Sequence, residues 1–243
     1  MMRYLVFSDI HGNIEALEMV LEEIAALRPD IVVSLGDVVG YGANPRECVE
    51  TVQECAHVRV SGNHDLAAIG LEDCDTFNQT AKRAIQWTAE RLEPRHREML
   101  ERYDPVRRYG GCVFAHGSPI SPLDFEYIYT VGQAKNVFTQ CAEKFVFIGH
   151  THVPSIIAYT EREGCRIIDQ SFASVAAGTR YLINVGSIGQ PRDGIAAASF
   201  TILDLKKNRM SIRRVPYDIS SAQKKIQSVG LPESLAMRLA TAR

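Results

Sequence analysis

Seven polar side chains follow five short apolar runs, close to the point where each run ends. They are carboxylates, imidazoles and one amide: Asp9, His11, Asp37, Asn63, His116, His150 and His152. Sites in open α/β sheets form outside the carboxyl ends of the strands, so we expect these side chains to meet at one edge. Nitrogen and oxygen donors without a thiolate suit Mn, Fe, Co, Ni or Zn better than Ca or Mg. The sequence therefore predicts a metal site.

The candidate ligands outnumber the coordination positions of one ion, so the sequence predicts two ions. Two ions that share a site need a bridging carboxylate, and Asp37 is the natural candidate. Paired ions lie about 3.5–4 Å apart, activate a water and bind phosphate oxygens. Each residue taken singly is also a common capping or turn residue at a strand end. Five such strand ends in one chain make that simpler explanation the weaker one.

Short apolar runs alternate with helical patterns in the first half of the chain, which is typical of an α/β sheet. The expected strands cover residues 4–7, 31–35, 57–60, 112–115 and 145–148. Asn13 is an expected N-cap, and Pro45 is an expected first-turn residue of the next helix. From the strand 145–148 to about residue 217 the chain is β-rich, with a hairpin of 199–205 and 210–215. Residues 219–243 form a weakly helical tail.

Residues 66–108 interrupt this alternation and are predicted to form two or three helices, a helical insertion in the same domain. One interpretation is a lid that sets specificity, and the other is a packing or dimerisation element. The apolar spacing of Ala84, Ile85, Thr88 and Leu92 favours packing.

Five motifs occur in a fixed order along the chain. They are Asp9-x-His11, Gly36-Asp37, Gly62-Asn63-His64-Asp65, a single His116 after a strand, and Gly149-His150-x-His152. Together they resemble the calcineurin-like metallophosphoesterase superfamily over about residues 4–217. The resemblance implies an α/β fold in which a two-sheet β sandwich is flanked by helices, in the order αββα. It makes residues 1–243 a single metallophosphoesterase domain, and it agrees with the β-rich second half.

The same resemblance assigns roles to the motif residues. It implies that Asp9, His11, Asp37 and His152 hold one ion. It implies that Asp37, Asn63, His116 and His150 hold the second, with Mn the expected metal and Fe, Ni, Co or Zn as alternatives. His64 binds no metal in that pattern but stabilises the transition state or protonates the leaving group. Asp65 is then expected to orient His64.

Residues 184–192 resemble an Asn-x-Gly-Ser…Pro-Arg segment of small bacterial members. Arg192 is therefore a candidate for a bidentate substrate contact, with an exposed loop charge as the alternative. Tyr41 is a candidate for lining the cleft, and Asn63 for contacting substrate as well as metal. Specificity is expected to lie in Tyr41, the insertion and the loop 118–129. His57 and His96 are expected to be surface or strand residues.

One departure from the family bears on the substrate. Protein Ser/Thr phosphatases of this superfamily carry an Arg after the Gly-Asp motif, whereas this chain has Val38-Val39-Gly40-Tyr41-Gly42 there. A small phosphodiester or nucleotide-like substrate, including a dinucleoside polyphosphate, is therefore favoured over a phosphoprotein. A nuclease ranks third. A non-catalytic scaffold or sensor of the same fold is the alternative from another class, although such a protein is expected to have lost ligands and His64.

The composition supports a globular domain without an extended nucleic-acid surface. The chain has 243 residues, 46% apolar and 23% charged, and a net charge of −2. Six cysteines without a Cys-x-x-Cys pair predict reduced thiols in a cytoplasmic protein. No apolar run reaches the length of a membrane span, and the initial run is too short for a signal peptide. We expect no membrane partner, and homo-oligomerisation is left open.

Overall fold

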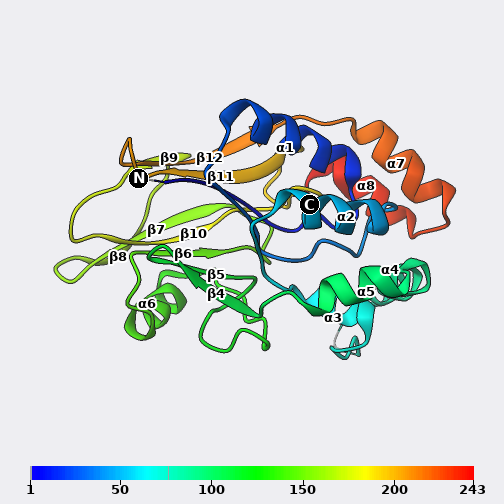
Figure 1. Cartoon of the computed structure of the whole chain (residues 1–243), viewed down its shortest axis with the longest axis horizontal. Helices are drawn as coiled ribbons and strands as arrows, with labels where there is room; N and C mark the ends of the chain where they lie inside the picture. Colours follow the sequence, from blue (N-terminus) through cyan, green and yellow to red (C-terminus); the bar gives the residue numbers. More distant parts are fainter. Residues whose placement is uncertain (1, 76) are drawn as a thin grey trace.

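Two mixed β-sheets of six strands each stack into a sandwich with helices on both outer faces (Figure 1). The computed structural model describes residues 2–75 and 77–243. One sheet, here called the β1 sheet, has the order β3-β2-β1-β11-β12-β9. The other, the β6 sheet, has the order β4-β5-β6-β10-β7-β8. The predicted fold class, a two-sheet β sandwich flanked by helices, is confirmed.

Each sheet combines parallel and antiparallel strands. The β1 sheet contains β3 (Val58–Arg59), β2 (Ile31–Ser34), β1 (Arg3–Phe7), β11 (Ala198–Asp204), β12 (Arg209–Val215) and β9 (Phe172–Ser174). The β6 sheet contains β4 (Val106–Tyr109), β5 (Cys112–Ala115), β6 (Phe145–Ile148), β10 (Arg180–Asn184), β7 (Ser155–Thr160) and β8 (Gly164–Ile167). In the first, β1, β2 and β3 are parallel; in the second, β5, β6 and β10 are. Parallel neighbours carry the residues that follow them to one edge.

The central strands are buried on both faces, which explains why they are continuous apolar runs. In β1, Tyr4 and Val6 pack into the core between the two sheets, whereas Leu5 and Phe7 pack toward the helices. In that inter-sheet core, Phe114 of β5 stacks on Phe147 of β6 with ring centroids 5.4 Å apart. Period-two alternation thus distributes one apolar run between two cores.

Helices cover both outer faces. They are α1 (Ile14–Leu27), α2 (Pro45–Cys55), α3 (Asn63–Ile69), α4 (Gln79–Arg91), α5 (Pro94–Glu101), α6 (Val131–Gln140), α7 (Ile219–Ser228) and α8 (Glu233–Thr241). Helix α1 packs on β11 of the β1 sheet, and α6 packs on β7 and β8 of the β6 sheet. Helix α3 packs on α4 and α5, and both of these pack on α2. Figure 1 shows α1 and α7 above the β1 sheet and α6 below the β6 sheet. As predicted, Asn13 caps α1, where its side chain accepts from the Ala16 N–H, and Pro45 opens α2. None of the described helices is both long and apolar enough to cross a membrane.

The helical insertion predicted at about 66–108 contains three helices, but its predicted end is wrong. Its helices begin at Asn63 and end at Glu101, and Val106–Tyr109 form strand β4 rather than part of a helix. A two-residue turn at Gly110 and Gly111, both with positive φ, joins β4 to β5. Two glycines in such a turn are a strong hairpin signal, and the arginines of this edge strand obscured its strand pattern. The short strand β9 was not predicted.

A core substitution tests the sandwich. Phe147 is fully buried between the sheets, whereas Phe172 on β9 is 44% exposed. We expect Phe147→Ala to lower the free energy of unfolding by about 3–5 kcal/mol because it opens a cavity in the core. The matched control Phe172→Ala should lower it by less than about 1 kcal/mol. Urea unfolding followed by circular dichroism measures both, and equal losses would contradict the assignment of the core.

Candidate metal centre

The carboxyl ends of strands from both sheets meet at one edge of the sandwich. Asp9 follows β1 and Asp37 follows β2, while His116 follows β5 and His150 follows β6. The two sheets approach so closely here that a Cβ at Gly149 would lie 2.1 Å from Ser8 Oγ. Glycine is therefore required at this tip. The predicted convergence of the strand ends is what the structure contains.

Three overlapping groups of buried side chains have ligand atoms within 4.8 Å of one another. They are Asp9–His11–His152, His11–Asp37–His64 and Asp37–His116–His150. Asp37 lies between the outer groups, with Oδ2 3.2 Å from His116 Nε2 and 3.6 Å from His11 Nε2. Asp9 Oδ1 lies 3.1 Å from His152 Nε2. Asn63 lines the adjacent cavity beside His64 and His150. The structure thus brings all seven predicted ligand residues to one place, and their roles as ligands stay predictions.

Five of these residues have backbone conformations that side chains seldom adopt. The φ angles are positive at Asp9 (56°), His11 (50°), Asp37 (50°), His150 (65°) and His152 (60°). Such left-handed positions cost about 1 kcal/mol or more each, and they cluster at functional sites. Glycine is also needed at position 62, for a steric reason, because a Cβ there would lie 2.1 Å from Asp37 Oδ1. The surrounding core therefore stabilises loops that aim these side chains inward.

Backbone carbonyls orient three of the imidazoles. The ring Nδ1 lies 3.1 Å from the Val39 carbonyl oxygen in His11, 2.9 Å from that of Leu35 in His116 and 2.6 Å from that of Gln190 in His152. A carbonyl only accepts hydrogen bonds, so each Nδ1 carries the proton. The lone pair of each neutral ring is then on Nε2, which faces the cluster. This is the arrangement that metal-binding histidines use.

Each carboxylate divides its oxygens between backbone and cluster. Asp9 Oδ2 accepts the His150 N–H at 3.0 Å, and Asp37 Oδ1 accepts the His64 N–H at 2.9 Å. The other oxygens, Asp9 Oδ1 and Asp37 Oδ2, point toward the imidazoles. The backbone bonds fix both carboxylates while leaving one oxygen of each for a cation.

The charges of the cluster are set by burial and by proximity. Burial opposes ionisation of Asp9 and Asp37, but neighbouring imidazoles hold the pKa of both well below the usual range. Burial also opposes the charged form of His116, yet the Asp37 and Asp9 carboxylates raise its pKa to about 9. Burial lowers the pKa of His150 to about 3 and that of His152 to about 4. At neutral pH the two carboxylates are therefore charged, His116 is protonated, and His150 and His152 are neutral.

The donor set fits divalent cations. His11 Nε2 and His152 Nε2 lie 3.1 Å apart. In the neutral form of each ring, with the proton on Nδ1, the two Nε2 lone pairs face each other with no hydrogen between them. Among the residues that the structure describes, the buried Asp9 Oδ1 and Asn63 Oδ1 have no hydrogen-bond partner. A cation would stabilise the opposed lone pairs and satisfy such orphaned oxygens.

Comparison with known proteins agrees with this geometry. A family model described as the calcineurin-like phosphoesterase superfamily domain matches residues 2–208. The chain belongs to that superfamily. It is 37% identical over 238 residues to an uncharacterized protein of Methanocaldococcus jannaschii, with 96% of each chain covered. The predicted resemblance is confirmed, and the chain is a member of a family of metal-dependent phosphoester hydrolases.

Two solved structures share the fold of this chain over its whole length. A metallophosphoesterase from Sphaerobacter thermophilus is 41% identical, with a TM-score of 0.87 and coverage of 100% of this chain and 99% of that one. A hypothetical protein from Pyrococcus horikoshii OT3 is 20% identical, with a TM-score of 0.80 and the same coverage. The second likeness concerns the fold alone.

Of the predicted catalytic pair, His64 lies beside the cluster as expected, whereas Asp65 makes different contacts from those expected. His64 is buried beside the cluster, and its ring packs against Tyr41 and Phe77. Asp65 does not orient His64. Among the described residues, the Asp65 carboxylate accepts hydrogen bonds from the backbone N–H groups of Val38, Val39 and Gly62. The reason is position, since Asp65 is the third residue of α3 and caps the start of that helix. It joins the loop after β2 to the loop after β3.

The predicted substrate residues Tyr41 and Arg192 lie together beside the cluster. The Tyr41 ring centroid is 4.6 Å from that of His11 and 4.6 Å from that of His64. The Arg192 guanidinium carbon is 5.8 Å from the Tyr41 ring centroid. Sequence reasoning missed Gln190, whose Oε1 accepts from Arg192, and Arg238, which donates to the same Gln190 oxygen. Arg238 belongs to the tail helix α8, where no motif marked it.

Two histidines lie outside the cluster. His57 is exposed, as predicted, and its Nδ1 accepts the Val32 N–H at 3.1 Å. His96 was predicted to be a surface or strand residue, and this is wrong. It is fully buried in α5, where its Nε2 lies 2.9 Å from Glu50 Oε1 on α2. The Pro94 start of the helix and an acidic partner on another helix explain how a polar ring is accommodated there.

A cavity of about 350 Å³ opens beside the cluster. Its base contains Tyr41, Asn63, His64 and His150, and its walls come from both regions predicted to set specificity. The insertion contributes Glu72, Phe77, Asn78 and Ala81, and the loop 118–129 contributes Asp124, Phe125 and Tyr127. Ala84, Ile85 and Thr88 of α4 are buried in the core, which confirms the packing interpretation of the insertion. Its role in specificity stays a prediction.

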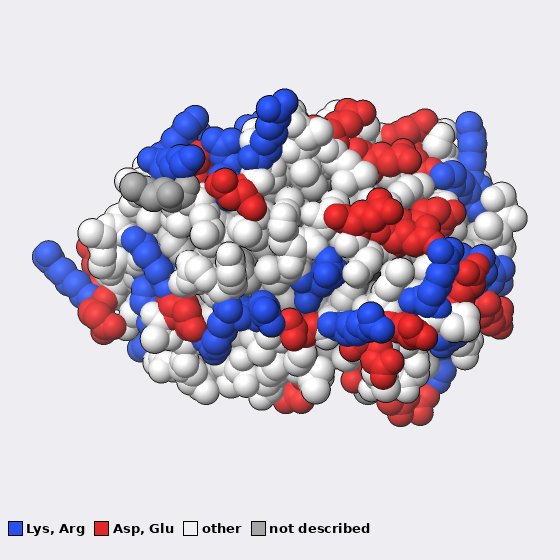
Figure 2. All heavy atoms as spheres, in the orientation of Figure 1, with Lys and Arg blue, Asp and Glu red and all other residues white. Residues whose placement is uncertain are grey.

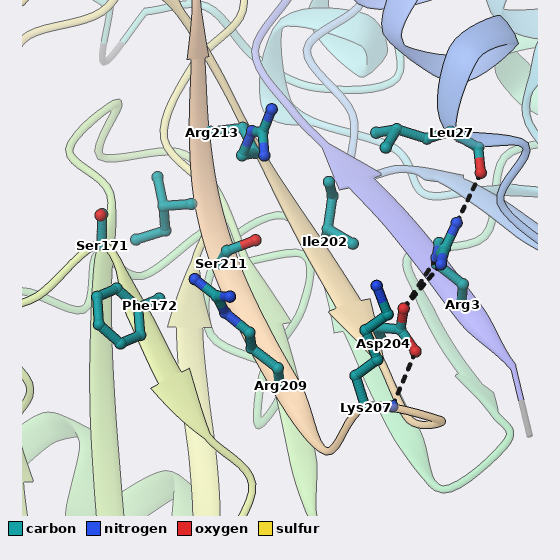
Figure 3. Close-up of a pocket in the computed structure, with 11 residues that line it drawn as sticks. Arg3, Leu27, Ser171, Phe172, Ile202, Asp204, Lys207, Arg209, Ser211 and Arg213 are labelled. Carbon is teal, nitrogen blue, oxygen red and sulfur yellow. Dashed lines mark hydrogen bonds and ion pairs between the residues drawn. The ribbon is translucent and has the colours of Figure 1, made fainter.

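A larger hollow of about 500 Å³ lies at the opposite end of β1 from Asp9 (Figure 3). It is lined by Arg3, Lys207, Arg209 and Arg213 and contains none of the predicted ligands. Arg3 in this hollow pairs with Asp204 and donates to the Leu27 carbonyl. Figure 2 shows Lys and Arg gathered over this end of the molecule, with both signs of charge interspersed elsewhere on that face. The hollow is a solvated basic surface remote from the cluster.

Proton release tests the charges of the cluster. Ligands must be deprotonated, so a metal ion has to displace the proton of His116, whose pKa is about 9. Addition of Mn²⁺ to chelator-treated protein at pH 7 should release about one proton per chain. The apparent affinity should rise about tenfold per pH unit toward pH 9. A pH indicator and titrations at pH 7 and 8 measure these quantities.

The sign of the stability effect follows from the same shift. Protonated His116 stabilises the metal-free fold fully below its unfolded pKa of about 6.5, and this contribution is lost as the pH rises through about 9. His57→Gln is the matched control and should leave the proton release unchanged. An affinity that does not depend on pH, or metal binding without proton release, would contradict the assigned charges.

Proposed function

We propose that this protein is a binuclear metal-dependent phosphoesterase that hydrolyses phosphodiester or nucleotide-type substrates. The observation that carries the proposal is Asp37, which lies between two groups of buried ligand atoms at the meeting point of two sheets. A second support is the adjoining cavity, whose base contains His64 and Asn63. Membership in the phosphoesterase superfamily agrees with both.

The residues divide into two ligand sets. Asp9, His11 and His152 would hold one ion, and Asn63, His116 and His150 would hold the other, with Asp37 shared between them. When bound, the ions supply an activated water and positive charge for the phosphoryl oxygens. The proposed metal is Mn, with Fe, Ni, Co and Zn as alternatives, because imidazole and carboxylate donors accept all of them.

His64 is placed to act on the phosphoryl group or its leaving oxygen. Its backbone N–H is held by Asp37 Oδ1, so the residue is fixed relative to the cluster. Its ring Nδ1 is buried with no partner among the described residues, and burial lowers the pKa of the ring. A neutral imidazole in this position donates one hydrogen bond to a phosphate oxygen as negative charge develops there. Arg192 adds a guanidinium 5.8 Å from the Tyr41 ring centroid.

The walls of the cavity support a leaving group with an aromatic ring. Tyr127 stacks on the His150 ring with centroids 3.9 Å apart, and Tyr129 stacks on Tyr127 at 5.4 Å. Glu72 and Asp124 also line the cavity, where their carboxylates can accept from sugar hydroxyls or amino groups. A nucleoside offers both kinds of contact. A dinucleoside polyphosphate therefore remains within the proposed class, and a phosphoprotein is the less favoured substrate.

Turnover of a simple diester tests the proposal. Protein stripped of metal and supplied with Mn²⁺ should hydrolyse bis-p-nitrophenyl phosphate. Asp37→Asn and His64→Ala should each lower kcat/KM about a hundredfold or more, because they remove a shared ligand and a group that stabilises transition-state charge. His57→Ala, an exposed histidine, is the matched control and should keep full activity.

Near-wild-type kinetics in both variants would contradict the mechanism. Absence of turnover with every metal and with both diester and phosphopeptide substrates would favour the scaffold or sensor instead.

A further inference from the structure

Two arginines share a single neutral acceptor beside the metal centre. Arg192 Nη2 donates to Gln190 Oε1 at 2.9 Å, and Arg238 Nη1 donates to the same oxygen at 3.4 Å. The two side chains come from segments far apart in the sequence, since Arg192 follows β10 and Arg238 lies on α8. The amide of Gln190 thus holds two positive charges side by side.

These guanidinium groups lack a compensating carboxylate. In the described ranges 2–75 and 77–243, no acidic side chain lies within 4.0 Å of either group. Arg192 Nε is buried and makes no hydrogen bond to any described residue. Burial and the Arg192 charge lower the pKa of Arg238. Two partly buried like charges with an unused donor are unfavourable alone, and an anion would remove the repulsion.

Hydrogen bonds link the arginine pair to His152, a candidate metal ligand. The backbone carbonyl of Gln190 accepts from His152 Nδ1 at 2.6 Å, and the Arg192 N–H donates to the His152 carbonyl at 3.2 Å. The Tyr41 ring lies near the Arg192 guanidinium and packs against the rings of His11 and His64. The arginines therefore extend the site toward α8, on which Arg238 lies.

The two sides of the site have opposite charge. Glu72 and Asp124 line the cavity and would repel an additional phosphate there. The arginine pair would attract one, and planar guanidinium groups bind phosphoryl oxygens in bidentate fashion. A substrate would thus place its sugar or aromatic part in the cavity and a further anionic group against the arginines.

We propose that Arg192 and Arg238 bind a second phosphoryl group of the substrate, next to the one that is hydrolysed. The proposal rests on the proposed function of the same site. It makes Arg238 a substrate-binding residue contributed from outside the matched family domain of residues 2–208. The neighbours Leu235 and Leu239 are buried in the core, so the helix holds Arg238 in place. Compounds with two linked phosphates are then preferred to monoesters.

Binding of a non-hydrolysable diphosphate tests this without requiring turnover. The Kd of α,β-methylene adenosine diphosphate and that of adenosine monophosphate are measured on Mn²⁺-loaded protein by calorimetry. Arg238→Gln should weaken the diphosphate analogue about tenfold or more, because a charge-assisted hydrogen bond is lost. The monophosphate should change less than twofold. Arg243→Gln removes the same charge from an exposed position near the end of the same tail and should affect neither ligand.

Equal weakening of both ligands would overturn the proposal, as would no change in either. Arg238→Lys guards against a folding defect: it keeps the charge and should weaken only the diphosphate analogue, by several-fold, because it lacks the planar fork. If Arg238→Lys loses the preference for the diphosphate analogue over the monophosphate while its unfolding temperature is unchanged, the result supports Arg238 as a phosphoryl-binding residue. If the protein fails to hydrolyse diesters but shows this Arg238-dependent preference, the anion site stands and the proposed hydrolysis does not.

Discussion

The close packing of buried imidazoles and carboxylates around Asp37 is the constraint on which the rest of this structure depends. Asp37 Oδ1 is fixed by the His64 N–H, and Oδ2 faces imidazoles from both sheets. Burial makes such a cluster unfavourable unless its charges are balanced. The sheets, the strained turns at their tips and the carbonyls that orient His11, His116 and His152 all serve to hold these groups in fixed positions.

The parts of the site that follow directly after strands were predictable. Parallel strands carry their following residues to one edge, so motif order and strand order together predicted that Asp9, Asp37 and His150 meet. The left-handed backbone at these residues and the carbonyl that each imidazole contacts depend on loop geometry, which a residue type does not reveal. Asp65 illustrates the limit. Its place next to His64 suggested a partner, but its helix-capping position takes its carboxylate to backbone N–H groups.

The fold was predictable where periodicity was strong and was missed where long-range contacts decide. Buried runs such as residues 145–148 gave the central strands, but β4 is an exposed edge strand rich in arginine, and only its Gly110-Gly111 turn marks it. The burial of His96 depends on a partner on α2. Arg238 lies in an amphipathic tail helix, and its sequence pattern indicates only that the apolar face packs against the core. Its proximity to Arg192 is a property of how α8 docks, and this docking is what gives the tail a proposed part in substrate choice.

The number of ions that the protein binds tests directly whether Asp37 is shared by two ions. Equilibrium dialysis against Mn²⁺ followed by elemental analysis measures it on the wild-type chain and on Asp37→Asn. We expect two ions per chain in the wild type and no more than one in the variant, because Asp37 is the carboxylate shared by both groups of ligands. A single ion in the wild type, or two retained by Asp37→Asn, would contradict it.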